Sequence, residues 1–264
     1  MQWNLTWLFV LKAVVIIASN AATIAIFTRT RRLHNKQHIM IISQAVADLL
    51  VGAGPIPLFI LYRQINKDYH KAYATIDGFC GGASLFGLAA LAIERAHATY
   101  FPFRHSTLGK GPYIIGILLM WSTASISCFR PFFWQFVAFT LAIISTSYSL
   151  VVIKVRCTSP QAHDVMIQEN KKLTVTLAVV TILSLVMWMP YACFTIAFLI
   201  DKTLLSRYPN LYYSVKLFQY GNSLVNSLVY AFRMREIKRE IFRLFQCCRR
   251  NRISISNASE LGNI

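Results

Sequence analysis

Three polar residues share one face of an apolar segment that covers residues 73–98. Asp77 lies 18 residues before Arg95, which is five turns of an α-helix, and Ser84 falls on the same stripe. At 1.5 Å per residue, the acid and the arginine are about 27 Å apart, close to the thickness of a bilayer's hydrocarbon core. Ionisable groups inside membrane helices are costly and usually mark function. The stripe therefore predicts an internal cavity, with a pair of interfacial charges as the alternative.

A second polar stripe follows residues 211–232, where hydroxyl and amide side chains recur at helical spacing: Tyr220, Asn222, Ser223, Asn226, Ser227 and Tyr230. Two more polar residues lie in the middle of apolar segments, namely Asp48 and Asn20. Hydrogen bonds between membrane helices are the alternative for these residues. That alternative is weakest for Asp48, because a buried carboxylate needs a proton, a cation or several donors.

The elements that must position these residues are apolar helices. Of 264 residues, 56% are hydrophobic and 14% charged, and the mean hydropathy is +0.49. Soluble proteins carry about 25% charged residues, so this composition predicts an all-α membrane protein. Seven segments are long enough to span a bilayer: 7–27, 38–61, 73–98, 113–129, 132–155, 173–200 and 211–232. A signal peptide is the alternative for the first, but Lys12 interrupts it and no positive charge precedes it.

Residues 113–155 are just long enough for two spans, and Arg130-Pro131 is the only interruption between them. A single long helix is the alternative, but proline breaks helices. We therefore expect a fourth and a fifth helix joined by almost no loop.

The net charge of +17 is distributed between the apolar segments rather than over one face, which does not indicate nucleic-acid binding. Most of the 27 Lys and Arg residues lie in alternate loops and in the C-terminal tail. The positive-inside rule then predicts a short extracellular N-terminus (1–6), a seven-helix domain (7–232) and a cytoplasmic C-terminus in the plasma membrane.

The cytoplasmic tail begins with an amphipathic pattern over residues 233–248, in which apolar residues recur at helical spacing and basic residues fill the other face. This pattern predicts a short eighth helix lying on the anionic leaflet of the lipid bilayer. Cys247 and Cys248 at its end resemble palmitoylation sites, with unmodified thiols as the alternative. Residues 249–264 are polar, and we expect a disordered tail. The six cysteines show neither a disulfide framework nor a zinc site.

Together these residues resemble a rhodopsin-like (class A) G protein-coupled receptor over about residues 7–248. The resemblance rests on motifs in the family's order: Ser19-Asn20, Ala45-Val-Ala-Asp-Leu-Leu50, Glu94-Arg95-Ala96, Pro102-Phe103, Trp121, Tyr148, Met187-Trp188-Met189-Pro190 and Asn226-Ser227-Leu-Val-Tyr230. It implies a seven-helix bundle that binds a small extracellular ligand and activates a heterotrimeric G protein.

The resemblance also implies site residues. An aspartate five turns before the motif arginine is typical of biogenic-amine receptors, so Asp77 is the expected counter-ion of a protonated amine. Tyr220 is expected to orient Asp77, and Trp188 and Tyr191 to supply cation–π contacts. The structural alternative is that Asp77 pairs with Lys216 or Lys71 and only holds the helices together. An opsin is the alternative, but its lysine would stand at the Tyr220 position, one turn from Lys216.

Two further sites follow from the resemblance. No cofactor is expected, but an allosteric sodium ion would bind among Asp48, Ser84, Asn222, Ser223 and Asn226. The activation switch at the cytoplasmic end would comprise Glu94, Arg95, Phe103, Tyr148 and Tyr230.

The chain also departs from the family pattern. The second extracellular loop is nearly absent, and the position of the usual cysteine at the outer end of the third helix holds His70. The alternatives are a receptor with a non-amine ligand or none, a shortened form that does not signal, and a transporter or channel. The two halves of the sequence show no internal repeat, which argues against a transporter. The sequence also shows no nucleophile–base pair of the kind that an intramembrane enzyme needs, so the chain is not expected to be an enzyme.

Overall fold

The computed structural model describes residues 3–30, 38–127, 133–157, 165–233 and 238–239, and no strand occurs among them. The long helices are α1 (Trp3–Arg29), α2 (His38–Ala53), α3 (Pro55–Gln64), α4 (His70–Tyr100), α6 (Gly111–Ser127), α7 (Phe133–Cys157), α8 (Val165–Ile200) and α10 (Pro209–Arg233). Short elements lie at the ends of the bundle: η2 (Lys67–Tyr69), α5 (Pro102–Thr107) and α9 (Leu204–Arg207).

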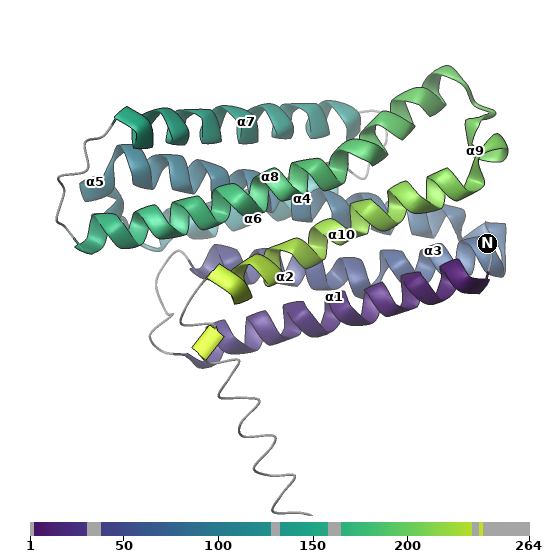
Figure 1. The fold of residues 1–264 in the computed structure, drawn as a ribbon, viewed down its shortest axis with the longest axis horizontal. Helices are drawn as coiled ribbons and strands as arrows, with labels where there is room; N and C mark the ends of the chain where they lie inside the picture. The colour runs from purple at the N-terminus through teal and green to yellow at the C-terminus, as the bar shows by residue number, and fades with distance from the viewer. Residues whose placement is uncertain (1–2, 31–37, 128–132, 158–164, 234–237, 240–264) are drawn as a thin grey trace, which may run out of the picture.

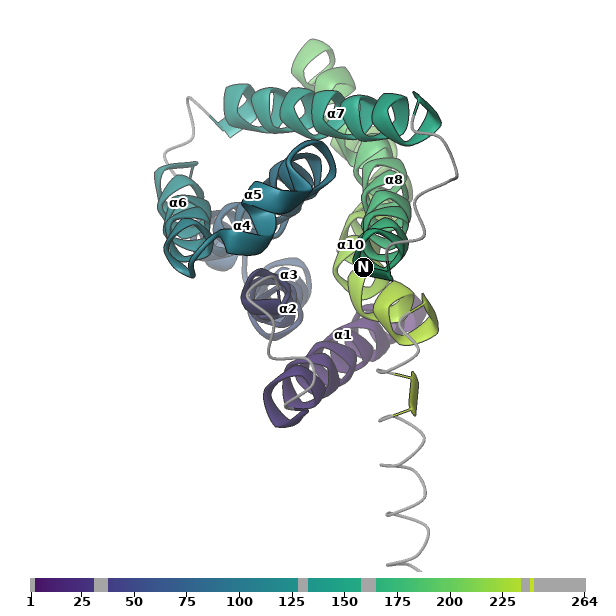
Figure 2. The ribbon, with the colours of Figure 1, turned by 90° about the vertical axis from the view of Figure 1, so that its left-hand side faces the viewer.

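The long helices lie side by side in one bundle (Figures 1 and 2). α4 is the central helix and packs against α2, α6, α7 and α8. The start of α1 lies with α3 and α9 at one end, and α5 lies at the other (Figure 1). With α2 and α3 counted as one span, the predicted seven-helix architecture is confirmed.

The second span differs from the continuous helix expected over residues 38–61. α2 ends at Ala53 and α3 begins at Pro55, because the proline ring has no N–H to continue the hydrogen-bond ladder. The two helices nevertheless continue the same span, since the amide of Gly54 still donates to Leu50 O (2.9 Å). The span is thus divided at Gly54 without a loop between its two helices.

Residues 113–155 form two helices, as predicted. α6 ends at Ser127 and α7 begins at Phe133, so only residues 128–132 join them. The predicted breaking residue, Pro131, lies outside the described residues.

Five spans are apolar enough to cross a membrane by length and hydropathy: Leu5–Arg29, His38–Gln64, Lys67–Tyr100, Phe136–Lys154 and Ala178–Ile200. α6 is apolar but shorter, and α10 contains more polar residues. The polar residues of α10 face the bundle, because Lys216, Asn222 and Asn226 are between 0% and 2% exposed. The low hydropathy of α10 therefore reflects an internal site and not a solvent-facing helix.

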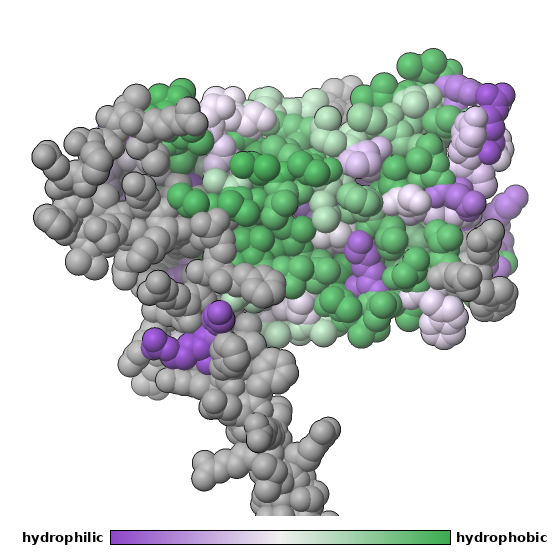
Figure 3. All heavy atoms as spheres, viewed as in Figure 1, coloured by the Kyte–Doolittle hydropathy of each residue, from purple (hydrophilic) through white to green (hydrophobic). Residues whose placement is uncertain are grey.

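The outer surface of the bundle is apolar. Large hydrophobic side chains on α6 and α8, such as Leu119 and Val186, are more than half exposed. Figure 3 shows hydrophobic residues across the middle of one face and hydrophilic residues gathered at the end that holds α9. A patch of this size on a soluble protein would drive aggregation, so it is the surface that faces lipid.

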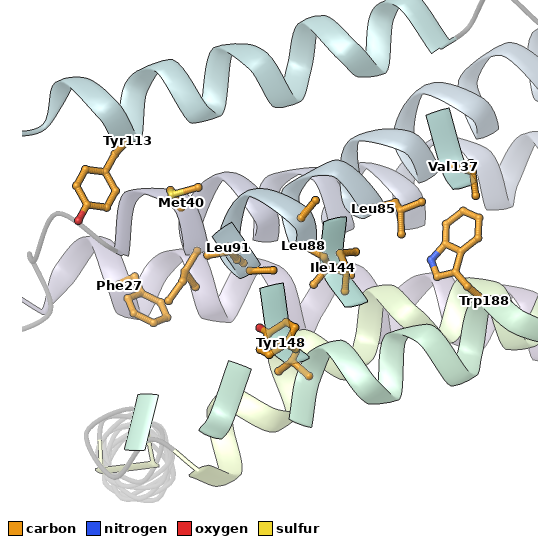
Figure 4. Close-up of a cluster of buried hydrophobic side chains, with 14 of the residues drawn as sticks. Phe27, Met40, Leu85, Leu88, Leu91, Tyr113, Val137, Ile144, Tyr148 and Trp188 are labelled. Carbon is orange, nitrogen blue, oxygen red and sulfur yellow. The ribbon is translucent and has the colours of Figure 1, made fainter. Parts of the chain in front are cut away.

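A buried apolar cluster holds the helices of the bundle together (Figure 4). It runs from Phe27 and Tyr113 at one end, through Leu88 and Ile144, to Trp188 at the other. Because α1, α4, α6, α7 and α8 all contribute side chains, the cluster fixes the helices on which the polar residues are mounted.

The predicted amphipathic helix over residues 233–248 lies almost entirely outside the described residues, as do Cys247 and Cys248 and the tail 249–264. The helix, the lipidation and these domain boundaries stay predictions.

Candidate functional site

The half of the bundle that holds α3 and α9 contains an ion pair between α4 and α10. Lys216 Nζ donates to Asp77 Oδ2 at 2.6 Å, and Tyr220 Oη donates to Asp77 Oδ1 at 2.9 Å. The side chains of Lys216 and Asp77 are 1% and 13% exposed. The structure thus brings together Asp77 and Tyr220, as expected, but the position beside the carboxylate is taken by the protein's own ammonium.

Aromatic rings surround this ammonium. Lys216 Nζ lies 4.1 Å from the centre of the Tyr191 ring, 5.3 Å from that of Tyr220 and 5.6 Å from that of Tyr73. The Tyr73 hydroxyl lies 3.4 Å from Asp77 Oδ2 and 3.3 Å from the Tyr220 hydroxyl. Cation–π attraction to three rings adds to the ion pair. The site is built to hold an ammonium in a nearly dry environment.

The rim above this site consists of side chains on α3 and α10. Arg63 Nη2 and Nε donate to the Tyr213 hydroxyl at 2.7 and 3.1 Å. The guanidinium also lies over the rings of Tyr62, Tyr212 and Tyr213, at 4.9 to 5.7 Å. We call these four residues the arginine rim.

A small cavity lies below the ion pair. Its volume of about 10 Å³ is of the order needed for one water molecule. Its lining includes Asp77, Trp188 and Gln219 on the outer side and Ser84 and Asn222 on the inner side. The cavity therefore connects the outer ion pair to the second polar site.

The second polar site surrounds Asp48, which is fully buried. Ser84 Oγ donates to Asp48 Oδ1 at 2.6 Å, Gln44 Nε2 donates to Oδ2 at 3.2 Å, and Asn226 Nδ2 also donates to Oδ2. Asn222 Nδ2 in turn donates to Ser84 Oγ at 3.2 Å. Four of these five side chains were predicted for the sodium site, and Ser223 lines the adjoining cavity.

The donor set around Asp48 fits a sodium ion. The amide oxygens of Gln44, Asn222 and Asn226 are buried and accept no hydrogen bond from a described residue. Oxygens of this kind beside a carboxylate are ligands that a hard cation prefers. Sodium held here would supply a positive charge that neutralises Asp48, and the amides would rotate to present oxygen instead of N–H.

Asn20 connects α1 to this region of α10. Its Nδ2 donates to Ser223 O at 3.0 Å, and its Oδ1 accepts from Ser227 Oγ at 2.7 Å. Asn20 is fully buried, and both its polar atoms are satisfied by these bonds. Its role is the interhelical hydrogen bonding expected as the alternative for this residue.

The C-terminal end of α4, next to α5, carries a second ion pair. Glu94 accepts two hydrogen bonds from the Arg95 guanidinium, and His105 Nε2 lies 2.8 Å from Glu94 Oε1. The Tyr113 hydroxyl lies 3.1 Å from the same His105 nitrogen. Arg95 is fully buried and its Nη1 has no hydrogen-bond partner among the described residues. This network ties α4 to α5 and α6.

The other predicted switch residues lie on three different helices. Tyr148 is packed in the apolar cluster on α7, and Phe103 on α5 is 84% exposed. Tyr230 lies near the end of α10, and its side chain is outside what the structure describes.

Comparison with known proteins shows what this arrangement is similar to. Residues 19–137 match the family described as "7 transmembrane receptor (rhodopsin family)". Over these residues the chain is similar to that receptor family. The crystal structure of squid rhodopsin superposes on 92% of the chain and 80% of its own length, with a TM-score of 0.82 at 16% identity. That likeness shows the fold.

Individual relatives of the receptor are distant. The human melatonin receptor type 1B is 23% identical over 97% of the chain and 82% of its own length. The bovine alpha-1A adrenergic receptor is 27% identical over 40% of the chain, and the match spans only 24% of that receptor. The chain thus spans about a quarter of that adrenergic receptor and most of the melatonin receptor, and both comparisons are with seven-transmembrane receptors, which are not enzymes.

Sequence reasoning missed three side chains of these sites. Gln44 and Tyr73 each lie one turn before a singled-out aspartate, so helical spacing alone would have found them. His105 follows a turn between two helices, where no periodicity relates it to Glu94. The pairing of Asp77 with Lys216 was foreseen only as the structural alternative to ligand binding.

Proposed function

We propose that this receptor binds a small extracellular ligand through a ligand ammonium at Asp77 and activates a heterotrimeric G protein from its cytoplasmic end. The observation that supports the ligand class is the Lys216 ammonium itself, held 2.6 Å from Asp77 among three tyrosine rings. A ligand ammonium would meet the same carboxylate and the same rings. The ligand ammonium would take the place of the Lys216 ammonium beside Asp77.

The inner end of the bundle supports coupling to a protein partner. Phe101 and Phe103 are 55% and 84% exposed beside the buried Glu94–Arg95 pair. Exposed aromatic residues are favoured in protein interfaces. We propose that release of Arg95 from Glu94 accompanies G protein binding at this end, which faces the cytoplasm in the proposed orientation.

The test of the ligand proposal is Asp77→Asn in cells that report G protein activation by a panel of amines. Removing one partner of a buried ion pair costs about 3–5 kcal/mol, so amine potency should fall at least about a hundredfold. Tyr220→Phe should cost only about 0.5–1.5 kcal/mol, the value of one hydrogen bond. Asp68→Asn is the matched control, because Asp68 is exposed and bonds only to Asn66 among the contacts found.

A second candidate is a receptor without a diffusible ligand, in which Lys216 is the permanent occupant of the site. The buried Asp77–Lys216 pair favours it directly. Equal amine potency in the wild type and a well-expressed Asp77→Asn variant would support this candidate and reject the amine proposal.

A further inference from the structure

We infer that the ligand of this receptor is a zwitterion, with a carboxylate for Lys216 as well as an ammonium for Asp77. The inference rests on the proposed function, and it concerns the chemical class of the ligand. The observation that carries it is that Asp77 and Lys216 are buried together and neutralise each other at 2.6 Å.

A plain amine would satisfy only half of this site. When its ammonium replaces Lys216 beside Asp77, the Lys216 ammonium is left in a place where its side chain is 1% exposed. Tyrosine rings attract a cation, but they do not replace a counter-charge in a dry site. Two ammonium groups would then compete for one carboxylate.

The other described aspartates are already engaged. Asp48 accepts hydrogen bonds from Ser84, Gln44 and Asn226, Asp68 is bonded to Asn66, and Asp201 accepts from the backbone and hydroxyl of Thr203. Lys216 therefore has no second acid to turn to among these. A carboxylate on the ligand supplies the missing charge, and the site remains neutral before and after binding.

Two features show how such an exchange is accommodated. Lysine carries its charge on a flexible four-carbon stem, so Lys216 can turn toward a ligand carboxylate without movement of α10. The small cavity lined by Asp77, Gly81 and Trp188 adjoins the ion pair and marks the side on which a ligand body would lie. The walls are aromatic, which favours a ligand with an aromatic or apolar body.

The experiment compares ligands that differ only in charge. Purified full-length receptor in lipid nanodiscs is titrated with three sets: phenylalanine, phenethylamine and 3-phenylpropionate; tryptophan, tryptamine and indole-3-propionate; leucine, isoamylamine and 4-methylpentanoate. Binding is read from the rise in the midpoint of thermal unfolding, which does not require a G protein. We expect the zwitterion of at least one set to bind tenfold or more tightly than its amine and its acid.

Substitutions then test which side chain binds each charged group of the ligand. Lys216→Gln should lower zwitterion affinity tenfold or more and leave the amine of the same set unchanged or tighter. Asp77→Asn should weaken both. Lys71→Gln is the control, because Lys71 is an exposed lysine at the outer end of α4. The comparison in the wild type needs no variant, so it decides the question even where a substitution prevents folding.

The outcomes separate the two proposals. If an amine binds as tightly as its zwitterion, and Asp77→Asn abolishes that binding, the zwitterion inference is wrong and the amine function stands. If only acids bind, or no compound of any set binds the wild type, the ligand part of the proposed function is wrong as well.

Discussion

Asp48 and Asp77 are carboxylates inside the same bundle, and their neighbours give them different capacities. Asp77 faces a single full charge, Lys216, whereas Asp48 faces three neutral donors. The side-chain amides around Asp48 are neutral and can rotate to present oxygen atoms to a cation. Asp77 is already neutralised, so it can bind another cation only if that cation replaces Lys216. The two residues thus suit an ion and a ligand, respectively.

At Asp48 we predict a sodium-dependent gain in stability. Replacing N-methyl-D-glucamine by Na⁺ at constant ionic strength should raise the unfolding midpoint of the wild type, because an ion that binds only the folded state stabilises it. Asp48→Asn keeps the shape of the side chain and should remove the effect. A sodium shift that persists in Asp48→Asn would place the ion elsewhere.

How far the sequence predicts these sites depends on the kind of contact. Helical spacing placed Asp77, Ser84 and Arg95 on one face, because a helix fixes the relative direction of residues along it. It did not decide between Lys216 and Lys71 as the partner of Asp77. That choice depends on the depth and tilt of α10 against α4, which are set by packing and not by local sequence.

The same distinction applies to the elements. Hydropathy predicted most spans to within a few residues, although α8 begins eight residues before the predicted segment 173–200, and Pro131 correctly predicted the division of α6 from α7. The docking of α5 under α4 was not predicted, because its contact is a tertiary one between His105 and Glu94. The break at Pro55 was overlooked, although proline inside an apolar run marks such a site.

For α5, we predict that His105→Leu releases the helix from α4. A hydrogen bond to a charged group is worth about 1.5–3 kcal/mol, so amide exchange over residues 102–107 should accelerate about tenfold or more. His105→Gln keeps a donor and should retain most of the protection. Unchanged exchange in His105→Leu would mean that apolar packing alone holds α5.

For the contact of α2 with α4, we predict opposite effects of two glycine substitutions in α4. A Cβ at Gly87 would lie 1.9 Å from Gln44 Oε1, and Gln44 cannot move without losing its bonds to Asp48 and Ser84. Gly87→Ala should therefore destabilise the receptor by about 1–3 kcal/mol.

Gly78→Ala is the matched control, since a Cβ there would meet nothing within 4 Å. It should be neutral or stabilising, by up to about 1 kcal/mol, because alanine favours the helix. Thermal unfolding of both variants tests the pair. Equal midpoints for Gly87→Ala and Gly78→Ala would show that Gln44 relocates freely.

For the whole molecule, we predict an extracellular N-terminus and a cytoplasmic C-terminus, from the seven spans and the distribution of basic residues. Epitope tags at the two ends should be labelled from opposite sides: the N-terminal tag on intact cells, the C-terminal tag only after permeabilisation. Labelling of both tags on intact cells would require an even number of spans.

The arginine rim has a consequence for the timing of any response. In the proposed orientation, a ligand reaches the Asp77–Lys216 pair past Arg63, which is partly exposed and donates to the Tyr213 hydroxyl. Partly exposed side chains turn within nanoseconds, far faster than loops open. Ligand exchange should therefore be rapid, and Arg63→Ala should raise the association and dissociation rate constants together while their ratio stays nearly constant. Because the ligand would dissociate quickly, the response of such a receptor would rise and fall with the ligand concentration and would end soon after a brief pulse of ligand.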